Sequence, residues 1–281
     1  MNIILSWPKL FVFMALLFIA QLFSYIVTLL IFKMKLVATI LNFGAYASVM
    51  LVQFLFLNLA YLVIVLYLPK ILKFKYNNAG QLFRKDWLWI FWILVVALGF
   101  SFQIVGSELE NIMAEFTGRN NISVRMIHEL ARLQGMPGFF LAVFFLAVCP
   151  PLFEEIFFRH IMQNGLKLKY GANIAIVITS LIFAAIHMNV STMPSIFLLS
   201  LVLGLLYEEY NLLASMVLHS SVNLSVVILN RMDNPPQGLN IDNAVAFERI
   251  DSGLLLLSSL VFFLCVYFIF RGNMKILPPK Y

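Results

Sequence analysis

The chain has 281 residues, of which 62% are hydrophobic and only 11% are charged. Soluble domains carry roughly 25% charged residues, so this composition excludes an ordinary water-soluble protein and indicates an integral membrane protein. The formal net charge of +6 is better explained by basic loops lying against anionic membrane lipids than by nucleic-acid binding, which we do not expect.

Apolar runs predict about eight membrane-spanning helices, because about 20 apolar residues cross a hydrocarbon core. In chain order, the expected spans are residues 9–32, 38–69, 87–105, 137–164, 172–188, 194–207, 211–230 and 252–270. The first lacks the charged start and cleavage site of a signal peptide, so we expect it to remain as an anchor. Pro150 and Pro151 are expected to kink or divide the fourth span. The predicted fold is an all-α, polytopic transmembrane helical bundle.

Two longer connections, residues 106–136 and 231–251, suggest three regions. Residues 1–136 would hold the first three helices and an outer loop. Residues 137–230 would form a central core, and residues 231–281 a loop and a last helix. Lys and Arg are concentrated in alternate connections, and the positive-inside rule then predicts that both termini are cytoplasmic.

Once Lys9 at the edge of the first span is counted with the loop charges, three acidic or basic residues lie within the predicted spans: Glu154, Glu155 and Arg159. A charge at bilayer depth costs at least a few kcal/mol, and such residues usually face an interior cavity and mark function. A purely structural ion pair is the alternative. Glu155 and Arg159 are four residues apart and can pair on one helix face. Glu154 is rotated by about 100° from Glu155, so we expect it on another face, where its carboxylate can accept a proton from water.

Two histidines, His187 and His219, also lie in apolar surroundings. Phe183 precedes His187 by one helical turn, and Asn223 follows His219 by one turn on the same face. A lone buried histidine is more often a satisfied packing residue than a ligand. Two histidines on different spans, together with a glutamate that lacks a salt-bridge partner, favour one shared cavity near the middle of the membrane.

Three segments resemble, in order, the EExxxR, FxxxH and HxxxN/D motifs of the CPBP intramembrane proteases. They are Glu154-Glu155-Ile-Phe-Phe-Arg159, Phe183-Ala-Ala-Ile-His187 and His219-Ser-Ser-Val-Asn223. This family, also called Abi, contains the CAAX proteases, including the Ras-converting CAAX endopeptidase, and the bacteriocin-processing enzymes. The resemblance covers about residues 137–230 and implies a four-helix catalytic core.

The resemblance also implies roles for the residues. Glu154 would activate water, and His187 and His219 would complete the site. Asn223 would help to stabilise the oxyanion. The supporting residues would be Glu155, Arg159 and Phe183. The family has been described both as zinc-dependent and as glutamate-dependent without metal. Two histidines and a carboxylate are an accepted catalytic zinc set, so Glu154, His187 and His219 are the candidate zinc ligands.

The sequence therefore predicts an intramembrane endopeptidase with no organic cofactor, acting on a membrane-associated peptide or a prenylated, CAAX-type protein. Its expected location is a bacterial inner membrane. One alternative is a non-catalytic scaffold, sensor or immunity protein with the same fold. A transporter or channel that relays protons or metal is less favoured, because no pair of related halves of the kind many transporters show is apparent in the sequence.

Overall fold

The computed structural model describes residues 88–118, 127–239 and 248–271, together with scattered residues between 12 and 67. These described residues form helices and no strand. The first two predicted spans, 9–32 and 38–69, lie largely outside the described residues. The all-α prediction is confirmed for the residues that the structure describes.

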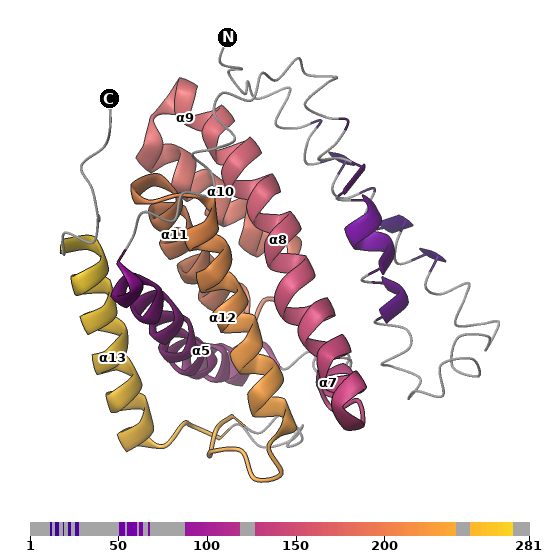
Figure 1. The fold of residues 1–281 in the computed structure, drawn as a ribbon, viewed down its shortest axis with the longest axis vertical. Helices are drawn as coiled ribbons and strands as arrows, with labels where there is room; N and C mark the ends of the chain where they lie inside the picture. Colours follow the sequence, from indigo (N-terminus) through magenta and orange to yellow (C-terminus); the bar gives the residue numbers. More distant parts are fainter. Residues whose placement is uncertain are drawn as a thin grey trace.

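The helices that surround the predicted site are shown in Figure 1. They are α5 (Trp89–Thr117), α7 (Gly135–Ala142), η1 (Val143–Val148), α8 (Cys149–Glu155), η2 (Ile156–Gln163), α9 (Asn164–Tyr170), α10 (Ala172–Ile186), α11 (Met193–Glu209), α12 (Leu212–Arg231) and α13 (Ser252–Arg271). The two η segments are π-helical. Because α7, η1, α8, η2 and α9 run on without a break, they form one helix, Gly135–Tyr170.

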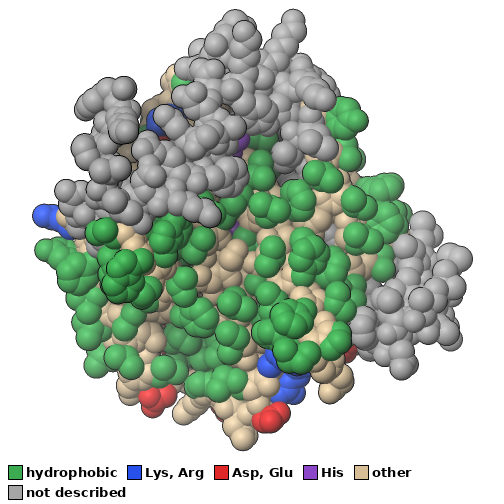
Figure 2. All heavy atoms as spheres, viewed as in Figure 1, with side chains coloured by type: hydrophobic (Ala, Val, Ile, Leu, Met, Phe, Trp, Pro, Cys, Tyr) green, Lys and Arg blue, Asp and Glu red, His purple; other side chains and the backbone are tan. Residues whose placement is uncertain are grey.

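Within the described residues, four helices are long and apolar enough to cross a membrane. They are Trp89–Thr117, Gly135–Tyr170, Leu212–Arg231 and Ser252–Arg271. Helices α10 and α11 are shorter. Apolar side chains cover the middle of the face shown in Figure 2, and acidic and basic side chains gather at its lower end. This distribution is that of a helical bundle surrounded by lipid.

Of the two outcomes expected at Pro150 and Pro151, a kink or a division of the fourth span, division does not occur, because Gly135–Tyr170 is one continuous helix. Both prolines occupy the first turn of α8, directly after the wider π turn of η1. The Cys149 N–H donates to the carbonyl oxygen of Phe144, five residues earlier. A π turn offers one way to pass residues that lack an N–H. The distortion stays local, at Val148, whose φ is −112°.

The predicted outer loop 106–136 was also too long, since α5 continues to Thr117. The polar residues that suggested a loop have partners in the following connection. Asn111 Nδ2 donates to the Gly238 carbonyl at 2.9 Å, and Glu108 accepts from Arg249 Nη1 at 3.0 Å. These contacts allow a polar segment to remain helical at the end of the bundle.

The helices pack as α13 against α5, α5 against α12, α12 against α8 and η1, and α10 against α11. A Cβ atom on Gly99 of α5 would lie only 2.6 Å from the Ser221 Cβ of α12. Glycine is therefore required for this close approach. Helix α12 is held between α5 and the Gly135–Tyr170 helix, and this position brings its polar face toward Glu154 and Glu155.

Candidate active site

The predicted pair of Glu155 and Arg159 is present at the start of η2. Glu155 Oε2 accepts from Arg159 Nε at 3.0 Å, and both side chains are completely buried. Arg159 Nη2 donates to Ser200 Oγ of α11 at 2.9 Å. The guanidinium also lies over the Phe183 ring, 5.3 Å from its centroid. The arginine thus joins η2 to both α10 and α11.

Glu155 has a second contact that the sequence did not indicate. Its Oε1 atom accepts a hydrogen bond from His219 Nδ1 at 2.9 Å, across 64 residues of sequence. A carboxylate that is already paired with arginine acts as the acceptor, so the proton of the neutral imidazole lies on Nδ1. His219 Nε2 then carries a lone pair and can accept a proton or bind a metal.

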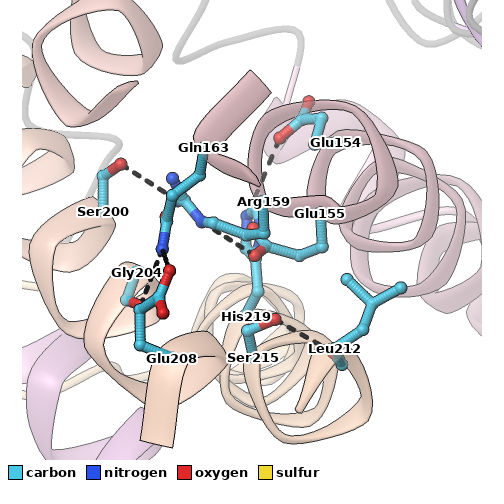
Figure 3. Close-up of polar contacts among 10 residues, drawn as sticks. All are labelled: Glu154, Glu155, Arg159, Gln163, Ser200, Gly204, Glu208, Leu212, Ser215 and His219. Carbon is cyan, nitrogen blue, oxygen red and sulfur yellow. Dashed lines mark hydrogen bonds and ion pairs between the residues drawn. The ribbon is translucent and has the colours of Figure 1, made fainter. Parts of the chain in front are cut away.

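Glu154 faces that free nitrogen (Figure 3). Its Oε2 atom lies 3.9 Å from His219 Nε2, and its side chain is 13% exposed. The side chains of Glu154 and Glu155 therefore approach opposite nitrogens of one imidazole ring. At this separation a carboxylate and a nitrogen lone pair do not bond directly to each other, but both can accept hydrogen bonds from a single water molecule.

His187 stands directly after the last residue of α10. Its Nδ1 atom donates to the Phe183 carbonyl at 2.7 Å, which leaves Nε2 as the acceptor on this ring as well. The Phe183 ring meets both imidazoles edge-on, with centroid distances of 4.9 Å to His187 and 5.8 Å to His219. Phe183 is thus the shared neighbour of the two histidines.

Asn223 lies one turn beyond His219 and reaches back to the Gly135–Tyr170 helix. Its Nδ2 atom donates to the Leu146 carbonyl at 2.9 Å. In an α-helix this carbonyl would accept from residue 150, and in a π-helix from residue 151, but both residues are prolines without an N–H. One N–H of the Asn223 amide is therefore used to satisfy the carbonyl that the two prolines leave free.

The sequence also failed to single out Gln163, which lies one turn beyond Arg159 and is completely buried. Gln163 Nε2 donates to the Gly204 carbonyl at 3.1 Å and to Glu208 Oε1 at 3.0 Å. Glu208 in turn accepts from Lys167. An amide within an apolar span, four residues from a buried arginine, was the signal that could have revealed this cluster.

The donor atoms only partly fit a zinc site. Histidines whose Nδ1 atoms donate to a carboxylate or a carbonyl, as in His219 and His187, have the arrangement common among zinc ligands. However, among the residues that the structure describes, no group of three His, Cys, Asp or Glu side chains could hold a metal ion. A catalytic zinc site needs three protein ligands, so we derive no step through zinc.

Comparison with known families bears on this core. Residues 136–225 match the model of the Rce1-like family, described as type II CAAX prenyl endopeptidase Rce1-like. Residues 136–225 are therefore similar to this family, and we call this segment the Rce1-like core. The match covers about a third of the chain and includes all the predicted site residues. No curated protein and no solved structure matches the chain.

The match confirms the resemblance that the three motifs indicated, and it supports a protease. Together with the four apolar helices, it supports an integral membrane protein. The Rce1-like core contains most of α7, all of η1, α8, η2, α9, α10 and α11, and most of α12. All the contacts of Glu154, Glu155 and His219 described above lie within it.

Proposed function

We propose that the Rce1-like core is an intramembrane endopeptidase that hydrolyses a peptide bond of a membrane-associated peptide or a prenylated, CAAX-type protein. The observation that carries this proposal is the 3.9 Å separation of the Glu154 carboxylate and His219 Nε2, with the opposite nitrogen of the ring held by Glu155. Two acceptors at this spacing can bind and polarise one water molecule inside a largely apolar bundle.

The reaction would use Glu154 as general base. Water donates one hydrogen bond to Glu154 and one to His219 Nε2, and its oxygen attacks the substrate carbonyl carbon. The water proton moves to Glu154, and the carbonyl π electrons move to oxygen and form the oxyanion. When the carbon–nitrogen bond breaks, the oxyanion electrons return to the carbonyl and Glu154 gives its proton to the departing amine. General acid–base catalysis of this kind contributes about 10²–10⁴-fold in rate.

The other predicted residues would support this reaction. Glu155 fixes the orientation and the tautomer of His219, and Arg159 keeps Glu155 charged and in place. His187 Nε2 offers a further acceptor for water. We assign the second amide N–H of Asn223, which its bond to Leu146 leaves available, to the oxyanion. Donors that are fixed before the reaction stabilise such developing charge effectively.

The membrane setting belongs to the same proposal. We propose a multi-pass protein of a bacterial inner membrane, with both termini in the cytoplasm, whose substrate reaches the site from within the lipid. Zinc bound by Glu154, His187 and His219 is the competing hypothesis, which the metal content of the purified protein tests.

The test uses the purified full chain in liposomes with two substrates, a farnesylated CAAX peptide and an unprenylated membrane-anchored peptide. Glu154→Gln is expected to lower the cleavage rate by at least about 10²-fold, without a loss of thermal stability. Glu209→Gln is the matched control, because Glu209 is an exposed carboxylate at the end of α11. Cleavage by Glu154→Gln at the wild-type rate would refute the proposal, and the two substrates report whether a prenyl group is required.

A further inference from the structure

Behind the Glu155–Arg159 pair, η2 and α11 face each other over two turns. Arg159 Nη2 contacts Ser200, and one turn further along both helices Gln163 Nε2 contacts the Gly204 carbonyl (Figure 3). These contacts use only part of each side chain. Arg159 Nη1 and Gln163 Oε1 take no part in them, and both side chains are completely buried.

Helix α10 packs against both η2 and α11. A Cβ atom on Gly204 would lie 2.9 Å from Ile176 Cγ2 and 3.0 Å from Gln163 Oε1. Ile176 and Gln163 therefore meet at the level of Gly204. The absence of a side chain at this position leaves the Gln163 oxygen beside the buried face of α10.

Two turns along α10 from Ile176, Phe183 lies against Arg159, with 5.3 Å between the Phe183 ring centroid and Arg159 Cζ. Thr179 and Ser180 stand between Ile176 and Phe183 on the same buried face. Along the helix axes, both hydroxyls therefore lie between Gln163 and Arg159. We call this contact between η2, α10 and α11 the three-helix junction.

Four buried polar atoms at the three-helix junction have no hydrogen-bond partner among the described residues. They are Arg159 Nη1, Gln163 Oε1, Thr179 Oγ1 and Ser180 Oγ. All four side chains have no exposed surface. A buried polar atom left without a partner destabilises the fold, and native proteins leave few of them. Four such atoms on the facing sides of three packed helices indicate a small polar ligand.

We propose that the three-helix junction binds one or more ordered water molecules. The atoms present suit water: Arg159 Nη1 can only donate, Gln163 Oε1 can only accept, and the hydroxyls of Thr179 and Ser180 can do either. A buried water typically makes about three hydrogen bonds. A water that accepts from the arginine and donates to the glutamine and one hydroxyl satisfies this number.

The position of this water also matters for the candidate active site. This consequence rests on the proposed hydrolase function. Glu208 joins Gln163 at one end of the junction, and Arg159 joins Glu155 and His219 at the other. Water between Gln163 and Arg159 completes a polar connection from the end of α11 to the candidate active site. Such a connection holds water near His219 within an apolar bundle.

Thr179→Val tests the proposal through the sign of its effect on stability. Valine has nearly the shape and helix propensity of threonine. If the hydroxyl binds water, its removal takes away a hydrogen bond, and we expect the Tm of the purified protein to fall by about 2–4 °C. If the hydroxyl is buried without any partner, its removal relieves a desolvation cost, and the Tm stays the same or rises. Either of these last results overturns the proposal.

Ser180→Ala and Ser225→Ala form a matched pair that corrects for helix propensity. Ser225 is also buried in a helix, but its Oγ donates to the Val222 carbonyl at 2.6 Å. Because the Ser225 hydroxyl has a partner, we expect Ser180→Ala to lower the Tm by at least as much as Ser225→Ala does if water binds the Ser180 hydroxyl. A Tm that falls for Ser225→Ala but stays the same or rises for Ser180→Ala would overturn the proposal.

An experimental structure at a resolution that shows ordered solvent gives the direct test. Density for water within hydrogen-bond distance of Arg159 Nη1 and Gln163 Oε1 is the expected result. A junction in which the side chains have closed on one another, with no such density, overturns the proposal. Neither the unfolding experiments nor the experimental structure depends on cleavage. The proposals of the water site and of the protease function are therefore tested separately.

Discussion

Asn223→Ala is expected to destabilise the protein, and Pro150→Ala is expected to reverse much of this effect. The Asn223 amide donates to the Leu146 carbonyl, which has no backbone partner because the two positions that could supply an N–H are prolines. Removing the amide leaves a buried carbonyl without a donor. Alanine at position 150 restores an N–H four residues after Leu146, where an α-helix would place it.

The size of the effect follows from the cost of an unpartnered buried group. Loss of the donor to Leu146 costs about 1–3 kcal/mol, which corresponds to a Tm decrease of about 2–4 °C for each kcal/mol in a chain of similar size. Two residues linked through one group show coupling energies of about 0.5–3 kcal/mol in a double-mutant cycle. We expect the coupling between Asn223→Ala and Pro150→Ala to be stabilising and within this range.

The assay is thermal or denaturant unfolding of the two single variants and the double variant in one detergent. Asn230→Ala is the control background, because Asn230 donates to the Val226 carbonyl of its own helix and has no relation to the prolines. Additive effects of Asn223→Ala and Pro150→Ala would refute the reasoning. Cleavage is expected to remain low in the double variant even where stability returns, because the proposed oxyanion donor is still missing.

Three further predictions concern the ion pair, the helix packing and the metal. Arg159→Met should lower the free energy of unfolding by about 3–5 kcal/mol, because it leaves the buried Glu155 charge unpaired. Adding Glu155→Gln should recover part of that free energy. A double variant less stable than Arg159→Met would contradict this reasoning. Gly99→Ala should destabilise by at least about 1–3 kcal/mol, since its Cβ would lie 2.6 Å from the Ser221 Cβ; wild-type stability would show that α5 and α12 separate easily. Peptide cleavage is expected to survive chelation, and loss of activity restored by zinc alone would establish a metalloprotease.

Local rules were sufficient for several features of this protein. Composition determined that it is a membrane protein, since too few charges are present for a soluble surface. The spacing of Glu155 and Arg159 predicted their pairing, because residues four apart lie on one face of a helix. The same argument separated Glu154 from that pair.

Only the tertiary structure decided which partners these residues meet. The bond between Glu155 and His219 joins residues 64 apart, and the approach of Glu154 to the other nitrogen of that ring depends on how α12 packs against α8. The helical period places a side chain on a face, but it does not say which helix covers that face.

The same limit explains the wrong expectations. Prolines indicated a kink or a division because sequence rules treat a missing N–H as a lost bond, whereas a π turn and the distant amide of Asn223 keep this helix undivided. Polar residues after position 105 indicated a loop, yet their partners in a later segment keep α5 helical to Thr117. Composition and helical period thus determined which residues are polar or apolar and which of them share one face of a helix. Packing determined which hydrogen bonds they make, because those bonds join atoms that only the folded chain brings together.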